Sequence, residues 1–231
     1  MKRKCLIVFT AVLLVVLTVF CFAACNKKKK DIDLSGNISY AETHKYTGSD
    51  ADFRACVTIG IKEKLFIADG NAQEVSDFAA IAVTPLKNNL LNKEYSFTLA
   101  YEGGEISGTL TRDVVTHAYS ANVDIGDFKD KLIALTVIYD DKSSVIELAD
   151  KLADKISYTQ VLEIAKGELG EQIDAALTDG KLPREICIKL IKDKRNPDSP
   201  FYWYISFIAA DNNYWALLLD PETGEVVTKK N

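Results

Sequence analysis

Apolar and polar residues alternate along the chain from about residue 38 to residue 148. From Phe53 to Ile59, for example, every second residue is apolar, so these side chains would share one face of an extended strand. Turn residues separate such runs, and Gly103-Gly104 lies between two of them as a hairpin loop would. Short strands at regular spacing are typical of an antiparallel sandwich or barrel. We therefore predict an immunoglobulin-like β-sandwich of seven or eight strands over residues 38–148.

The pattern changes near residue 149, where helical periodicity replaces the alternation. Ser157 and Gln160 have the spacing of a capping box, in which each side chain satisfies a backbone donor of the first turn. Apolar residues follow at helical spacing, and Asp179-Gly180 is a stop signal. Three later runs favour antiparallel strands, namely Glu185–Lys192, Phe201–Ala210 and Tyr214–Asp220. Residues 149–231 are thus predicted as a helix packed on a three-stranded antiparallel sheet, which makes the chain α+β.

The first 30 residues have the organisation of an export signal. A basic head, Met1–Lys4, precedes twenty mostly apolar residues, and four lysines follow at 27–30. Twenty residues can also just span the hydrocarbon core of a bilayer, so an uncleaved anchor is the alternative. Both interpretations place the remainder of the chain outside the cytoplasm and at a membrane.

The residues Phe22-Ala23-Ala24-Cys25 resemble the lipobox of bacterial lipoproteins, with Phe22 where that family prefers an aliphatic residue. The resemblance implies that residues 1–24 are a lipoprotein signal peptide and that Cys25 is acylated. Membrane lipid would then be a partner through Cys25, on the outer face of a bacterial cell membrane. Residues 25–37 would comprise the lipidated Cys25 and a basic tether, Asn26–Asn37, that reaches at most about 40 Å when extended.

The C-terminal part resembles the PepSY domain, in which a helix precedes strands that end in an Asp-Ala-x-Thr-Gly-Glu turn. The matching segments are Ile156-Ser157 and Asp220–Glu225, where Pro221 replaces the usual alanine. The resemblance covers about a third of the chain. It implies an extracytoplasmic, non-enzymatic module that restrains a peptidase or senses at the cell surface. It implies no catalytic residue and no cofactor.

Charge excludes one class of partner. The chain has 28 Lys and Arg against 33 Asp and Glu, but seven of the basic residues and no acidic one lie within residues 1–30. Residues 31–231 therefore carry 21 basic and 33 acidic residues. Nucleic-acid binding needs clustered basic residues that neutralise phosphates, and this composition argues against it.

Two cysteines remain if Cys5, Cys21 and Cys25 are accounted for by the signal and the lipid. Cys56 and Cys187 could form one disulfide in an exported compartment, or they could be small apolar side chains in separate strands. No Cys-x-x-Cys pair is present, and the chain has only two histidines. We therefore predict no metal site.

The remaining candidate for a binding site is an aromatic cluster in the last two predicted strands. If neighbours in a strand face opposite ways, Trp203 points to the helix while its neighbours point away from it. The cluster is then either core and domain contact, or an exposed platform for a peptide or glycan. The candidate surface residues are Tyr202, Tyr204, Tyr214 and Trp215.

No nucleophile, base and orienting group can be assembled from motifs in this sequence. Ser107 misses the Gly-x-Ser-x-Gly spacing by one position, and no pair of carboxylates is singled out by its spacing. We therefore predict a non-enzymatic binding or regulatory module whose partner is a peptidase or another surface protein. The alternatives are a structural or adhesive surface protein and, with less support, a carboxylate-dependent hydrolase.

Overall fold

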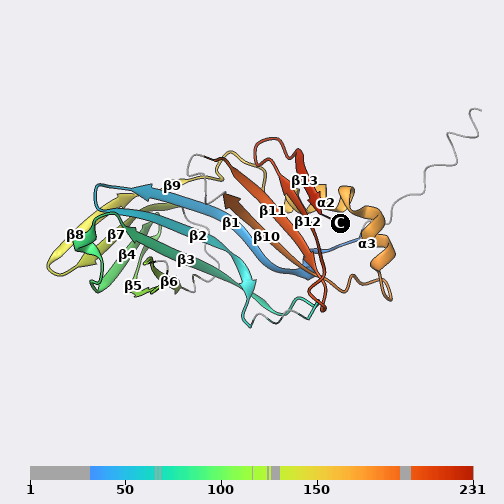
Figure 1. The fold of residues 1–231 in the computed structure, drawn as a ribbon, viewed down its shortest axis with the longest axis horizontal. Helices are drawn as coiled ribbons and strands as arrows, with labels where there is room; N and C mark the ends of the chain where they lie inside the picture. The colour runs from blue at the N-terminus through green and yellow to red at the C-terminus, as the bar shows by residue number, and fades with distance from the viewer. Residues whose placement is uncertain are drawn as a thin grey trace, which may run out of the picture. The chain divides into compact units, whose positions relative to one another are not determined.

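The computed structural model describes residues 32–65, 67, 69–115, 117–123, 125, 131–192 and 199–230 (Figure 1). The chain divides into two compact units, Met1–Asp33 and Leu34–Asn231, and all the helices and strands described here belong to the second. In the described residues, no helix is long and apolar enough to cross a membrane.

Strands account for most of the described residues. The strands before the helices are β1 (Ile38–Ser49), β2 (Phe53–Glu63), β3 (Val75–Pro85), β4 (Tyr95–Tyr101), β5 (Gly104–Arg112), β6 (Tyr119–Val123), β7 (Leu132–Tyr139), β8 (Lys142–Glu147) and β9 (Ala149–Asp150). The α-helices α2 (Tyr158–Glu168) and α3 (Gly170–Ala176) precede β10 (Glu185–Lys192), β11 (Phe201–Ile208), β12 (Tyr214–Leu219) and β13 (Val226–Lys230). Short 3-10 turns lie at Ser35–Asn37 and Asn88–Leu90.

The 13 strands belong to one mixed sheet, in the order β13-β12-β11-β10-β1-β2-β3-β6-β5-β4-β7-β8. β1 and β10 pair in parallel, whereas the other pairs are antiparallel. β8 leads through Leu148 into β9, which pairs with β1 at Tyr46 and Thr47. The strands from β1 to β8 therefore return to β1 and enclose one apolar core.

The predicted α+β fold, with an immunoglobulin-like sandwich and a separate three-stranded sheet, is wrong. The structure is mostly β, since the strands of the first part continue into those of the last part through the β1–β10 pair. The last part contributes four strands, because Val226–Lys230 forms β13 at the sheet edge. The domain boundary near residue 149 stays a prediction.

The pairing between β1 and β10 ends at a bulge in β1. The register of β1 on β2 shifts between Glu42 and His44, and the pairing with β10 ends at Ala41. Beyond that point the carboxylate of Glu42 accepts a hydrogen bond from the backbone N–H of Leu190 at 3.1 Å. The Lys45 ammonium lies 2.9 Å from the same oxygen. Glu42 thus replaces the missing strand acceptor at the junction.

Helix α2 begins where the sequence predicts it. The Ser157 hydroxyl accepts from the backbone N–H of Gln160 at 3.3 Å, and the Gln160 side chain accepts from the Ser157 N–H at 2.8 Å. The predicted helical stretch is divided at Leu169, whose φ of −107° and ψ of 12° interrupt the helix between α2 and α3. Lys229 of β13 donates to the Glu168 carbonyl at the end of α2.

Candidate binding surfaces of the C-terminal strands

The register of β11 assigns its side chains to two faces. Trp203, Ile205 and Phe207 lie on the face packed by α2, and each is at most 1% exposed. The indole Nε1–H of Trp203 donates to the Ile156 carbonyl at 3.0 Å, just before the helix cap. Since successive residues of a strand alternate, Tyr202 and Tyr204 lie on the opposite face.

Three of the predicted surface residues come together on that opposite face. Tyr204 pairs with Leu218 across β12, and Tyr214 pairs with Ile208, so Tyr202, Tyr204 and Tyr214 share one side of the sheet. All three side chains are partly exposed. Lysines flank them: the Lys189 ammonium lies 5.5 Å from the Tyr204 ring centroid, and the Lys230 ammonium lies 3.4 Å from that of Tyr214. We call Tyr202, Tyr204, Tyr214, Lys189 and Lys230 the tyrosine face.

Trp215 lies on the other side of the sheet from the tyrosine face. It pairs with Phe207 in the register, and the two ring centroids are 6.3 Å apart. The Arg184 guanidinium stacks over its ring at 3.7 Å and donates to the Asn213 carbonyl at 3.1 Å. Closeness in sequence placed Trp215 with the tyrosines, but the strand alternation separates them.

The tyrosine face continues onto β1 and β2, which the sequence did not predict. Tyr40 pairs with Cys187 on β10 and with Lys62 on β2. Its ring centroid lies 5.5 Å from that of Phe78, and its hydroxyl lies 3.4 Å from the Glu42 carboxylate. Burial and the neighbouring Glu42 carboxylate raise the pKa of the Tyr40 phenol, which therefore stays protonated and can donate.

Cys56 and Cys187 are both free and lie on strands β2 and β10. Cys187 pairs with Tyr40, whereas Cys56 pairs with Thr47, further along β1. Seven residues of strand correspond to about 20 Å, and a disulfide needs Cα atoms within about 7 Å. The two thiols are therefore separate side chains. Burial raises the pKa of both.

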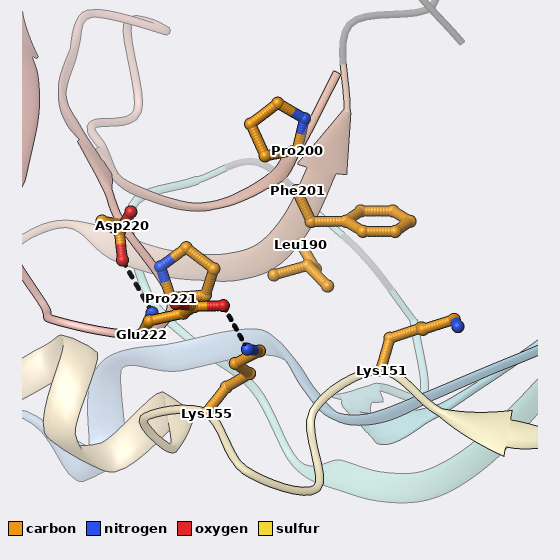
Figure 2. Close-up of a pocket in the computed structure, with 8 residues that line it drawn as sticks. All are labelled: Lys151, Lys155, Leu190, Pro200, Phe201, Asp220, Pro221 and Glu222. Carbon is orange, nitrogen blue, oxygen red and sulfur yellow. Dashed lines mark hydrogen bonds and ion pairs between the residues drawn. The ribbon is translucent and has the colours of Figure 1, made fainter. Parts of the chain in front are cut away.

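A pocket of about 390 Å³ opens on the α2 side of the sheet, near the ends of β10 and β11 (Figure 2). Its lining comes from the loop before α2, from the adjoining strands and from the turn after β12. The lining residues are Lys151, Lys155, Leu190, Pro200, Phe201, Asp220, Pro221 and Glu222. No single stretch of the sequence contains this set, so no sequence motif marks the pocket.

The turn after β12 forms one wall of the pocket and is held from several sides. The Asp220 carboxylate accepts from the backbone N–H groups of Glu222 at 2.8 Å and Thr223 at 2.9 Å. These backbone donors lower the pKa of Asp220. The Pro221 carbonyl accepts from the N–H of Ile156 at 2.9 Å, which ties the turn to the start of α2. Gly224 has a φ of +76°, a conformation that favours glycine.

The buried carboxylates of the described residues serve the backbone. Besides Glu42, they are Glu63, which accepts from the Gln73 N–H, and Glu185, which accepts from the N–H groups of Asp69 and Gly70. Each thus holds a strand or loop in place. Within the described part of the chain, no group of three or more His, Cys, Asp or Glu side chains is arranged to hold a metal ion.

Comparison with known families identifies the last third of the chain. Residues 155–230 match the family model described as "PepSY: Peptidase propeptide and YPEB domain". These residues form a PepSY domain. No curated protein and no solved structure matches the chain. The matched PepSY residues include α2, α3, β10–β13, the tyrosine face and the turn that walls the pocket.

A PepSY domain is compatible with a non-enzymatic regulatory role and with a peptidase as partner. The family match at residues 155–230 confirms the predicted PepSY resemblance. The lipobox and Cys25 lie outside the described residues, and acylation of Cys25 stays a prediction.

Proposed function

We propose that this protein is an exported lipoprotein that regulates a peptidase by binding it through the tyrosine face of its PepSY domain. Cys25 would carry the lipid and hold the protein on the outer face of a bacterial membrane. The protein itself would turn over no substrate, and its effect would be to restrain the bound peptidase.

The observation that carries the proposal is the tyrosine face. Helix α2 packs on β10 and β11 from one side, while Tyr202, Tyr204 and Tyr214 remain partly exposed on the other. Tyrosine rings offer large apolar contact area with a polar hydroxyl at low entropic cost, so they are frequent anchors of protein interfaces. The lysine ammonium groups beside the rings add positive charge, which suits a partner surface with carboxylates.

Crosslinking from one position on this face tests the proposal. A photoreactive phenylalanine analogue at Tyr204, introduced into the full chain in its native membranes, should form an adduct with a protein that contains a peptidase domain. The same analogue at Val145 is the matched control, because Val145 is 63% exposed on β8, far from β11 in the strand order. Adducts of equal yield from both positions, or an adduct without a peptidase domain, would contradict the proposal.

Removing the anchors should weaken the same complex. The double substitution of Tyr202→Ala and Tyr204→Ala should reduce the affinity for the captured peptidase at least tenfold, since truncating an aromatic hot spot of an interface costs about 2 kcal/mol or more. The purified peptidase should also lose its inhibition by the variant. The urea midpoint of the variant should stay close to that of the wild type. Unchanged binding and inhibition would show that these tyrosines do not form the interface.

Acylation of Cys25 gives a separate expected result. Labelled palmitate should enter the wild-type chain and should not enter Cys25→Ala, because the thiol of Cys25 is the proposed attachment site. Cys21→Ala is the control, and it should be labelled like the wild type. A mature protein that retains residues 1–24 would show that the segment is an uncleaved anchor.

A further inference from the structure

The pocket on the α2 side of the sheet has an apolar wall against which a side chain could pack. Leu190 and Phe201 lie on one side of it, and Pro221 faces it from the turn after β12 (Figure 2). Leu190 itself is only 4% exposed, so its position is fixed by packing. A volume of about 390 Å³ is at the lower end of ligand pockets, which suits one or two residues rather than a folded surface.

The carboxylates in and near the pocket already accept hydrogen bonds or form ion pairs. Asp220 accepts two backbone N–H groups of its own turn. Glu222 forms an ion pair with Lys155 at 2.5 Å. In the adjoining strands, Asp150 is paired with His44 at 2.8 Å, and Glu42 is held by Lys45 and the Leu190 N–H. Asp220 keeps its negative charge, with one oxygen held by its own turn, whereas the other three carboxylates are each paired with a lysine or histidine side chain.

Two ammonium groups beside the pocket lack such partners. Lys151 is exposed and has no hydrogen bond or ion pair from its side chain to any described residue. Its backbone is fixed, because its N–H donates to the Lys45 carbonyl at 2.7 Å. The Lys192 ammonium lies 5.4 Å from the Phe201 ring centroid and has no carboxylate partner among the described residues. Among the lining residues, Lys151 is thus the charged group with the fewest constraints on its side chain, and Lys192 adds a second cation next to Phe201.

We propose that this pocket binds the carboxyl-terminal residue of a polypeptide, with an apolar side chain against Leu190 and Phe201 and the α-carboxylate at Lys151. A chain end carries both groups on one residue, which matches a small pocket with an apolar wall and a cationic rim. Leu190 and Phe201 project to the α2 side of the sheet, away from Tyr202 and Tyr204, so this site is distinct from the tyrosine face.

Fluorescence anisotropy with a short peptide tests the site on the full chain in detergent. The probe is a pentapeptide that ends in leucine with a free carboxylate and carries fluorescein at its N-terminus. The same peptide with a C-terminal amide is the matched control. The free acid should bind at least fivefold more tightly than the amide, and its affinity should fall as salt is raised.

Two variants locate the contacts. Lys151→Gln should weaken binding of the free acid at least fivefold and leave that of the amide unchanged, because the lost contact is to the carboxylate. Phe201→Ala should weaken both peptides. Lys142→Gln, an exposed lysine on β8, and Tyr204→Ala should change neither.

Equal affinity for acid and amide, or an equal effect of Lys151→Gln on both, would overturn the proposal. N-acetyl-leucine that competes as well as the peptide would assign the pocket to a small free acid and overturn the polypeptide assignment. Loss of binding in Tyr204→Ala would place the peptide on the tyrosine face instead. If the pocket does not bind the peptide, the proposed peptidase interface still stands, since that interface is tested separately with variants of Tyr202 and Tyr204.

Discussion

Replacing Trp203 by alanine is expected to lower the free energy of unfolding by about 3–5 kcal/mol, the range for large-to-small changes of buried aromatic residues. The Trp203 side chain is 1% exposed beneath α2. The substitution would leave a cavity between β11 and the helix. It would also remove the indole donor of the Ile156 carbonyl, which positions the helix cap.

Urea unfolding followed by circular dichroism measures this change, and the neighbouring residue supplies the control. Tyr202→Ala alters the same strand on the opposite face, where the side chain is partly exposed, and should cost no more than about 1 kcal/mol. Trp203→Phe keeps most of the apolar volume and should fall between the two. If Tyr202→Ala and Trp203→Ala were equally destabilising, the assignment of the two faces would be wrong.

Replacing Gly60 by alanine is expected to destabilise the protein by about 3 kcal/mol, at the upper end of the range for overpacked sites. A Cβ atom on Gly60 would lie 2.1 Å from the carbonyl oxygen of Ala41 and 3.0 Å from the Cα of Glu42. Both atoms belong to the backbone of β1 at its bulge, so they cannot move without breaking strand pairs.

Gly167 provides the matched substitution for this experiment. It lies inside α2, and a Cβ atom there would meet nothing within 4 Å. Gly167→Ala should therefore stabilise the chain by about 0.5–1 kcal/mol through helix propensity. Thermal unfolding of the two variants should move in opposite directions. A Gly60→Ala variant as stable as the wild type would show that β1 can separate from β2 at the bulge.

Local features of this fold could be predicted from the sequence. The capping box of Ser157 and Gln160 can be recognised because it is a short motif with a fixed spacing, and it forms as predicted. The alternation from Phe53 to Ile59 correctly places Phe53, Ala55 and Val57 in the core, each at most 1% exposed. Alternation also predicts that Trp203 is buried, because its neighbours on β11 must face the other way.

The pairing of distant strands could not be predicted in this way. Ile38 of β1 pairs with Ile186 of β10, and a parallel pair so far apart in sequence leaves no local pattern. The edge strand β13 was missed because its residues are nearly all exposed, so alternation of apolar and polar residues does not mark it. The β1–β10 pair joins the C-terminal strands to the rest of the sheet, and β13 adds a fourth strand to them. Because neither can be predicted from local pattern, the sequence suggests a separate three-stranded sheet where the sheet is continuous.

The candidate sites also divide into features that local sequence predicts and features that depend on strand register or on the folded chain. Tyr202, Tyr204 and Tyr214 could be found because they are close in sequence on adjacent strands, while the faces they occupy depend on register. Trp215 was assigned with them although register places it beside Phe207. The pocket depends on turns and strand ends from Lys151 to Glu222, and its shape exists only once the chain has folded.

The pairing of β1 with three other strands also determines how the fold would respond to mechanical force. β1 is the first strand of the described residues, and it is bonded to β2 along its length, to β10 near its start and to β9 near its end. A pull on the chain before Ile38 would act along β1 and load these bonds in shear. Bonds perpendicular to an antiparallel strand then share the load instead of breaking one by one. A partner pulling on the C-terminal strands would transmit tension through β10 directly into β1, so the fold would resist extension between its N-terminal segment and its PepSY domain.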